Sequence, residues 1–402
     1  MAPINQTDIY TILKNLSIDS GFFRVPRNAF YSPDDVANVL IHASTSSTDS
    51  IESASYDLKE LYPDFRIPSA DTIHGHIKRC HDVKSLLKSF TEINYSLIDC
   101  MSIRGTSQII ALDFHTIPYY GNISTRGISG IKPKNGTSWG YSYLTTDIVN
   151  FNKQTIDVIP LTGLNKDYST LIEGVIHRIN SQKIYIEKML MDREFFNCKA
   201  IITLNKFDTK FIMPAKYDKR LKVVVKEYEK EYGIVPGILD YKFKDEQCPW
   251  FHLVLIPNKH YDSSKKEGKD NKKFYLFATN INYTSTKEFI SDVPQQYRIR
   301  WNIETGYRMK NIFKIRTCTK SPIVRLFLFL LQCLLHNYLN ILKRILVITA
   351  YTLKSRIQVE LRKFFRSEVN QQAQPSIAVF YNLIKRFNNL RILEFRTHLN
   401  LI

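Results

Sequence analysis

The stretch "TSQIIALDF" (residues 106–114) decides the fold of this chain, because it is a β-branched and aliphatic run that closes on an acid, Asp113. Two runs of the same kind follow, "SWGYSYLTTDIV" (138–149) and "QTIDVIPL" (154–161). The first two runs are joined by "GNISTRGISGIKPKNGTS" (121–138), which has the composition of a long loop. Three consecutive strands without an intervening helix predict an antiparallel meander.

Helices and strands alternate after the meander. Residues 165–182 have the pattern of an amphipathic helix, and "KIYIEKMLMD" (183–192) has that of a strand ending in a second acid, Asp192. Residues 198–207 fit a helix or a strand, and "KFIMPAKY" (210–217) fits a strand. This order predicts a mixed α/β sheet.

Helical signals dominate residues 1–105. Ser32 and Pro33 begin one predicted helix as its N-cap and first position, and residues 50–62 and 70–80 form two more. A helix, a turn containing proline and a further helix are compatible with a helix-turn-helix, and a plain helical bundle fits equally well. We predict a helical N-terminal DNA-binding region.

A Lys- and Glu-rich island occupies residues 216–285. Its strand candidates are "LKVVVKEYE" (221–229), "WFHLVLIP" (250–257) and "KKFYLFATNI" (272–281). Helical patterns return after residue 286. The chain is therefore expected to have five parts: a helical region at 1–105, the first part of a catalytic core at 106–215, a β-rich insertion at 216–285, the final helices of the core at 286–350, and a basic helical region at 351–402.

Positive charge is concentrated near the C-terminus. The chain of 402 residues carries 56 Lys and Arg against 38 Asp and Glu, a net charge of +18. Residues 291–402 hold 19 Lys and Arg against 5 Asp and Glu, so 19 − 5 = 14 of these charges lie there. A uniform lysine bias of the genome would not produce this asymmetry. The surplus indicates a polyanionic partner, with nucleic acid favoured over an anionic membrane surface.

Other classes of protein are disfavoured. The six cysteines are scattered without a Cys-x2-Cys pair, which argues against a zinc ribbon or a disulfide framework. The N-terminus lacks the pattern of a signal peptide. The apolar stretch 326–342 is short for a membrane span and contains Gln332 and His336, so a buried core helix is the better interpretation. These observations favour a cytoplasmic protein.

Three acids are candidate metal ligands. Asp113 and Asp192 each close a predicted strand, where the active sites of α/β folds commonly lie, although either acid alone is more often a turn residue or a helix cap. The third acid is Glu304, within "YRIRWNIETGYR" (297–308). Three carboxylates suit two magnesium ions that activate the attacking oxygen and stabilise the leaving oxygen of a phosphodiester.

Glu304 lies among cationic side chains. On one continuous helix, with about 100° per residue, five residues would share a narrow stripe: Tyr297, Arg300, Glu304, Arg308 and Asn311. A carboxylate among arginines is ordinarily a salt bridge. A metal ion bound beside a DNA phosphate explains the same arrangement, since the arginines and the tyrosine would hold the DNA.

The segment "YRIRWNIETGYRMKN" (297–311) resembles the Tyr-x2-Arg-x3-Glu-x6-Lys signature of DDE transposases from insertion sequences, in the branch typified by insertion sequence four. "LDFHTIPYYG" (112–121) and "MDREFF" (191–196) resemble the first- and second-aspartate segments of that family. The resemblance covers roughly residues 67–345. Asn311 stands where the family has lysine; Lys310 lies one residue early, facing away from the stripe, and Lys314 lies nearer to it. Glu194 replaces a usual glycine.

The resemblance implies an RNase H-like catalytic domain interrupted by a β-rich insertion, and a DNA transposase that cuts transposon ends and transfers the strands to target DNA. Asp113, Asp192 and Glu304 would be the catalytic metal ligands for two Mg²⁺ or Mn²⁺ ions. The implied partners are double-stranded DNA, as terminal inverted repeats and as target, and a second subunit in a homodimer on paired ends. The implied location is the nucleoid in the cytoplasm, without a membrane. The predicted DNA-binding residues are Tyr297, Arg300, Arg308, Arg193 and Lys314. The alternative is a non-catalytic DNA-binding protein derived from a transposase.

Overall fold

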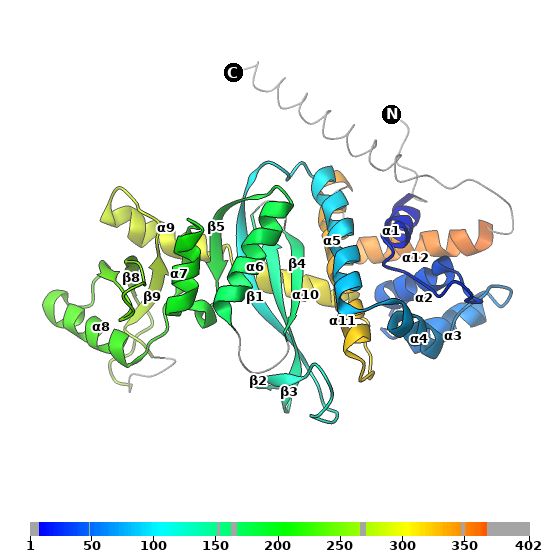
Figure 1. Ribbon diagram of the computed structural model, residues 1–402, viewed down its shortest axis with the longest axis horizontal. Helices are drawn as coiled ribbons and strands as arrows, with labels where there is room; N and C mark the ends of the chain where they lie inside the picture. Colours follow the sequence, from blue (N-terminus) through cyan, green and yellow to red (C-terminus); the bar gives the residue numbers. More distant parts are fainter. Residues whose placement is uncertain are drawn as a thin grey trace, which may run out of the picture.

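The protein is elongated and built around one large mixed sheet (Figure 1). The computed structural model describes residues 8–47, 49–150, 153–161, 167–265, 271–346 and 350–367. A bundle of helices lies at one end of the sheet, and a smaller group of strands and helices lies at the other (Figure 1). The mixed α/β fold that the sequence predicts is confirmed.

The N-terminal residues form the predicted helices. Ser32 begins α2 with a full capping box, in which its hydroxyl accepts from the backbone of Asp35 and the Asp35 carboxylate accepts from the backbone of Ser32. Ser50 and Ser69 cap the two following helices. The helices of this region are α1 (Asp8–Asp19), α2 (Pro33–Thr45), α3 (Ile51–Leu61), α4 (Ala70–Cys80) and α5 (Val83–Cys100).

The predicted meander forms the centre of the sheet. Strand β1 (Ser107–Pro118) pairs antiparallel with β3 (Thr137–Ile148), which pairs antiparallel with β4 (Gln154–Leu161). Strands β5 (Tyr185–Met191) and β6 (Phe211–Pro214) continue the sheet on the other side of β1, each parallel to its neighbour. The central order is therefore β4-β3-β1-β5-β6.

Part of the predicted loop at 121–138 is a strand, β2 (Ser129–Lys134). It forms a hairpin with β3 through Asn135 and Gly136, whose φ angles of 51° and 83° define a primed turn. The prediction was wrong here because the Asn-Gly pair was read as loop composition. An Asn-Gly pair between two strand-like runs is the usual signal of a two-residue hairpin.

The Lys- and Glu-rich island extends the same sheet. Strand β9 (Phe274–Thr279) pairs with β6, and β8 (Phe251–Pro257) and β7 (Gly237–Tyr241) follow outward. The segment 221–229 is not a strand but part of helix α8 (Lys219–Tyr232). Its three valines suggested a strand, but its buried residues follow a helical spacing that outweighs them: Leu221, Val225 and Tyr228.

Each face of the sheet is covered by helices. Ile110 and Leu112 of β1 face a core shared with α6 (Tyr168–Ser181) and α7 (Cys198–Lys206), so the ambiguous segment 198–207 is a helix. Ile109 and Ala111 alternate to the opposite face, against α9 (Thr286–Arg298) and α10 (Trp301–Lys310). The last two helices are α11 (Pro322–Leu346) and α12 (Ala350–Ser367).

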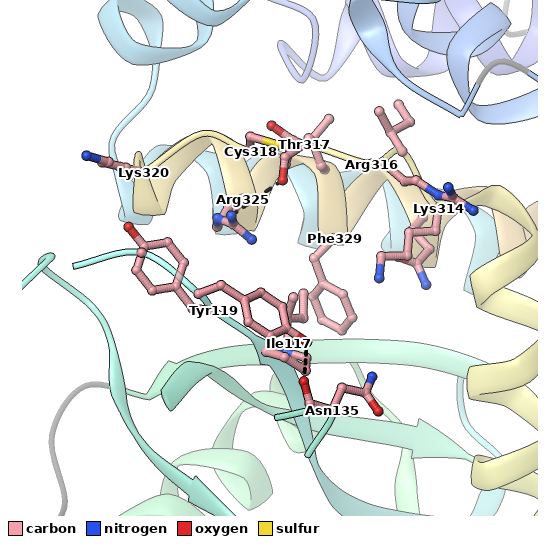
Figure 2. Close-up of a pocket in the computed structure, with 16 residues that line it drawn as sticks. Ile117, Tyr119, Asn135, Lys314, Arg316, Thr317, Cys318, Lys320, Arg325 and Phe329 are labelled. Carbon is pink, nitrogen blue, oxygen red and sulfur yellow. Dashed lines mark hydrogen bonds between the residues drawn. The ribbon is translucent and has the colours of Figure 1, made fainter. Parts of the chain in front are cut away.

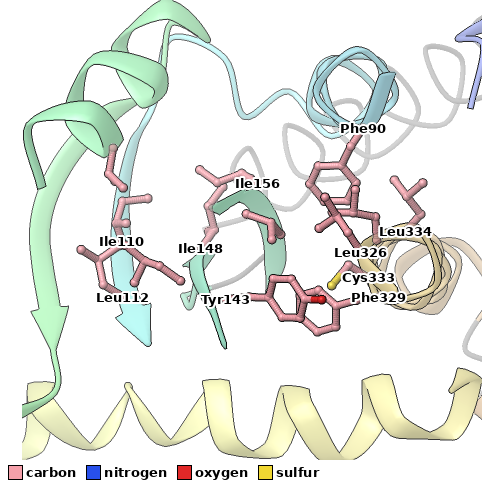
Figure 3. Close-up of a cluster of buried hydrophobic side chains, with 14 of the residues drawn as sticks. Phe90, Ile110, Leu112, Tyr143, Ile148, Ile156, Leu326, Phe329, Cys333 and Leu334 are labelled. Carbon is pink, nitrogen blue, oxygen red and sulfur yellow. The ribbon is translucent and has the colours of Figure 1, made fainter. Parts of the chain in front are cut away.

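Helix α11 is the apolar stretch predicted to be a core helix. It is long and apolar enough to cross a membrane, but 83% of its most apolar window is buried inside the protein. Phe329, Cys333 and Leu334 of α11 pack with Phe90 of α5 and Tyr143 of β3 (Figure 3). Burial on this scale supports the core interpretation.

Helix α12 returns to the N-terminal helices, and the Gln358 amide donates to the Thr45 hydroxyl at 2.6 Å. The predicted basic region at 351–402 is described only as far as Ser367, and residues 368–402 lie outside the described residues. None of the described cysteines forms a disulfide, as expected: Cys80, Cys198, Cys248, Cys318 and Cys333.

Asn337 of α11 attaches this helix to the open edge of β4. Its side-chain oxygen accepts from the Thr155 amide at 2.9 Å, and its side-chain nitrogen donates to the Thr155 carbonyl at 2.8 Å and to Asn94 at 2.7 Å. The buried side chain thus satisfies backbone groups that an edge strand would otherwise leave unpaired.

Replacing Asn337 with Leu is expected to lower the free energy of unfolding by about 3 kcal/mol or more, since three buried groups lose their partners. Denaturant titration measures the loss. Gln332→Leu on the same helix is the matched control. Gln332 donates to the side chain of Asn311, which is exposed and can be satisfied by water, so the expected loss is below about 1 kcal/mol. Equal losses for the two variants would contradict this role of Asn337.

Candidate active site

Asp113 and Asp192 lie side by side at one edge of the sheet. Leu112 of β1 pairs with Met191 of the parallel strand β5, and each aspartate is the next residue of its chain segment. Asp192 follows the last residue of β5, but Asp113 lies inside β1, which continues to Pro118, so the prediction that Asp113 closes its strand is wrong. The parallel pairing still keeps the two aspartates level with each other, and their carboxylates project into one region. Asp192 precedes a short 3-10 helix (Arg193–Phe195), and its carboxylate forms no cap hydrogen bond there.

The carboxylate of Asp113 is held in an unusual electrostatic environment. Its pKa is raised to about 6, chiefly by burial and also by the negative charges of Asp192 and Asp147, against the opposing positive charge of Arg300. The guanidinium of Arg300 donates through Nη2 to Asp113 Oδ1 at 2.6 Å. Arg300 is buried, with 6% of its surface exposed, so this contact is desolvated and strong.

The segment 297–311 is not one continuous helix, and the predicted single stripe is wrong in this respect. Helix α9 ends at Arg298 and α10 begins at Trp301. The backbone amides of Ile299 and Arg300 bond to carbonyls three residues earlier, at 3.1 and 2.9 Å. A turn of about three residues breaks the 100° progression of an α-helix. Arg300 therefore lies in the junction and points at Asp113.

Glu304 is in α10, the helix that crosses the face of the sheet containing Asp113. Its side chain lies outside the described part of the structure. The neighbouring residues define how α10 docks: Ile303 is buried against the Ala111 face, and the hydroxyls of Tyr307 and Thr145 lie 2.5 Å apart. Thr145 is the cross-strand partner of Asp113, so α10 is anchored directly beside that aspartate.

A buried ion pair anchors the end of α10. Lys310 is fully buried, and its ammonium donates to Asp147 Oδ1 at 2.8 Å. The same oxygen accepts from the Thr155 hydroxyl at 2.6 Å. Asp147 pairs with Ala111 in the sheet, so it lies on the same face as Asp113.

Sequence reasoning did not assign Asp147 or Lys310 to the site. The available signal was the spacing of Ile303, Tyr307 and Lys310 on one helical face, together with an acid inside a strand that is otherwise buried. The lysine points into the protein because its charge is neutralised by Asp147.

The other predicted site residues are distributed over two areas. Tyr297 is near the aspartates, since their charges add to the burial that raises its pKa to about 12, and its ring packs 5.3 Å from that of Phe277. Arg193 and Arg308 are exposed at the surface. Lys314 lies elsewhere, in a cavity beyond the end of β1. The structure thus brings Asp113, Asp192, Arg300 and Tyr297 together and leaves Lys314 apart.

The donor set at the sheet edge fits a hard divalent cation. Within the described part of the chain there is no group of three or more His, Cys, Asp or Glu side chains able to hold a metal. Asp113 and Asp192 therefore form a pair, and the side chain of Glu304 lies outside that search. Two converging carboxylates, one of them with a raised pKa, offer the oxygen ligands that Mg²⁺ and Mn²⁺ prefer.

Paired aspartates on neighbouring parallel strands of a mixed sheet are an arrangement that suits metal-assisted phosphoryl transfer. A family model described as "Transposase DDE domain" matches residues 104–338, more than half of the chain. The chain belongs to this transposase family, as the resemblance implied. No curated protein matches the chain.

A solved structure shares the fold. It is titled "Cryo-EM structure of piggyBac transposase synaptic complex with hairpin DNA", and its similarity to this chain has a TM-score of 0.55 at 14% sequence identity. The match covers 93% of this chain and 81% of that chain. It therefore extends from the sheet into the flanking helical regions.

Proposed function

We propose that the protein is a DNA transposase that cuts phosphodiester bonds at transposon ends and transfers the resulting strand into target DNA. The observation that carries this proposal is the pairing of Leu112 with Met191, which sets Asp113 and Asp192 side by side inside the matched transposase domain. The excess of positive charge supports a DNA substrate.

Asp113, Asp192 and Glu304 would together hold two Mg²⁺ or Mn²⁺ ions. Such ions, when bound, supply the activation of an attacking oxygen and the stabilisation of a leaving oxygen. The raised pKa of Asp113 supports this assignment, because burying one carboxylate beside another is unfavourable unless a cation shares them. The main-chain positions of the two aspartates are fixed by the sheet, so the ligands are preorganised.

Arg300 supplies part of the positive charge at this site. Its guanidinium is bonded to Asp113, and binding of a cation by that carboxylate would compete with the contact. We propose that Arg300 neutralises Asp113 in the free protein and turns to the DNA backbone when the carboxylate takes a metal. Tyr297, which lies near the aspartates, and the exposed Arg193 and Arg308 are proposed to contact DNA.

The spacing of Tyr297, Arg300 and Glu304 favours the branch of the family typified by insertion sequence four. Asn311 departs from that signature, and the adjacent Lys310 is committed to Asp147. The lysine contact to DNA expected of the branch is therefore proposed to come from Lys314.

The likeness to the family also supports proposals for the rest of the chain. We propose that the helices before residue 106 bind DNA and that residues 216–285 act as an insertion in the catalytic core. We also propose that the protein works at the nucleoid as a homodimer on paired ends.

Removal of divalent cations is expected to abolish cutting and spare binding. Purified protein with a duplex that carries the DNA flanking the gene should yield nicks with 3′-hydroxyl ends in Mg²⁺ or Mn²⁺, and none with EDTA. Gel analysis of end-labelled DNA measures the cuts, and a shuffled duplex is the control. Tight binding to the flanking DNA without any cut in either metal would favour the non-catalytic alternative.

A further inference from the structure

A cavity of about 430 Å³ lies beyond the end of β1, away from the paired aspartates. Its floor is formed by Ile117 and Phe329, and its rim by the connection between α10 and α11 (Figure 2). Lys314 and Arg316 stand at one end of this rim and Lys320 at the other (Figure 2). A cavity with an apolar floor and a polar rim has the character of a ligand site.

Positive charge predominates around the cavity. Burial lowers the pKa of Lys314, and the charges of Lys134, Arg316 and Arg325 lower it further, with no acid opposing them. Within the described ranges, no carboxylate forms an ion pair with Lys134, Lys314 or Lys320. These neighbouring positive side chains repel one another, and a bound anion would relieve that repulsion, so the cavity favours an anionic ligand.

Two of the cations have protein partners that fix them in place. Arg316 pairs with Asp49 at 3.5 Å. Arg325 donates to the Thr319 carbonyl at 2.7 Å, and its guanidinium lies 5.3 Å from the centre of the Tyr119 ring. Lys314 and Lys320 remain exposed at the rim and are the cations able to reach a ligand.

An aromatic side chain completes the site. Tyr120 is 67% exposed, yet its hydroxyl donates to the Asn135 carbonyl at 2.9 Å. The ring is thus held in place while its face stays in water. A fixed aromatic beside two free lysines suits a ligand with alternating anionic and flat or apolar groups, as in a nucleic-acid strand.

The distance between the cavity and the paired aspartates also fits a nucleic-acid strand. Four residues of β1 separate Asp113 from Ile117, which corresponds to about 13 Å along an extended strand. Successive nucleotides advance about 3.4 Å along each strand of a duplex. For a duplex whose axis runs along β1, the cavity is thus about four nucleotides away from the proposed site of cutting.

We propose that this cavity binds the backbone of the DNA strand about four nucleotides from the cut, with Lys314 and Lys320 contacting its phosphates and Tyr120 packing on the nucleotide between them. The inference rests on the proposed function, because it places DNA at Asp113. An acidic segment of a protein would meet the same charges but would gain less from the exposed ring.

The test is the salt dependence of DNA binding by the full chain, measured by fluorescence anisotropy of a labelled flanking duplex in EDTA. For Lys314→Gln/Lys320→Gln, the slope of log K against log salt should decrease in magnitude by about 2, since each phosphate contact contributes about 0.9. Lys314→Arg/Lys320→Arg should keep the slope of the wild type. On a single-stranded oligonucleotide of the same sequence, whose bases are free to stack, Tyr120→Ala should weaken binding on the order of tenfold.

Lys183→Gln/Lys210→Gln is the matched control. Both lysines are exposed, and each precedes the start of a parallel strand, so neither lies where the aspartates project. The control should keep the wild-type slope. An unchanged slope in the Lys314/Lys320 variant, or an equal decrease in the control, would overturn the inference.

The assay also separates this inference from the proposed function. Cutting by the wild type in Mg²⁺, together with an unchanged slope in the Lys314/Lys320 variant, refutes the cavity alone. Absence of cutting, together with the expected decrease in slope, refutes the transposase activity and leaves the cavity as a DNA contact.

Discussion

Asp113→Asn and Asp192→Asn are each expected to reduce DNA cutting by at least about 10²- to 10³-fold. Asparagine keeps the shape of the side chain but removes the negative charge and one strong metal-binding oxygen. Glu304→Gln is expected to have the same effect, because a two-metal site needs all three carboxylates. Quantified cutting of an end-labelled duplex in Mg²⁺ measures the loss.

Binding distinguishes a loss of chemistry from a loss of folding. DNA affinity measured in EDTA should not fall in these variants, since the carboxylates repel phosphates when no metal intervenes. Asp157→Asn is a matched control: Asp157 is a buried acid of the same sheet, paired with Arg178 at 2.6 Å in the middle of β4. It should retain cutting within a few-fold of the wild type. Normal cutting by any of the three site variants would refute the assignment of that residue.

Lys310→Met is expected to lower the free energy of unfolding by about 3–5 kcal/mol, because it leaves the carboxylate of Asp147 buried without its counter-charge. Loss of the Lys310–Asp147 ion pair should also reduce DNA cutting at the candidate active site. Lys310 fixes the end of α10, which carries Glu304, so the variant should cut poorly even under conditions in which it is folded. Denaturant titration and a cutting assay at low temperature measure the two effects.

A double-mutant cycle gives the matched comparison. Asp147→Leu/Lys310→Met replaces both charges with apolar side chains and should recover most of the lost stability. The coupling energy between the substitutions at positions 147 and 310 should be on the order of 2–3 kcal/mol. If the losses of the two single variants simply add, the ion pair does not anchor α10, and its position beside the site is incidental.

The local signals in the sequence were sufficient for most of the fold. Ser32, Ser50 and Ser69 cap helices as their sequence contexts predict, and the apolar runs at 106–161 form the meander. The error at 221–229 arose because valine favours strands in isolation, whereas burial follows the helical spacing of Leu221 and Val225. Local propensity was overruled by packing.

The candidate site was predictable in part. Asp113 and Asp192 are visible in the sequence as acids that follow aliphatic runs, although β1 continues past Asp113 to Pro118, and their adjacency follows from the parallel pairing of their strands. The contact between Arg300 and Asp113 joins residues 187 positions apart, and it depends on a 3-10 turn that a regular helical wheel does not represent. The burial of Lys310 likewise depends on Asp147, whose position on the sheet is a tertiary fact.

The central claim is that Asp113, Asp192 and Glu304 converge on shared metal ions. Crystals of the protein soaked in Mn²⁺ and measured near the manganese absorption edge test it most directly. We predict anomalous density within about 2.5 Å of carboxylate oxygens of Asp113 and Asp192, with Glu304 completing the site. Manganese bound elsewhere, with Asp113 still joined to Arg300 and Glu304 directed away, would contradict the claim.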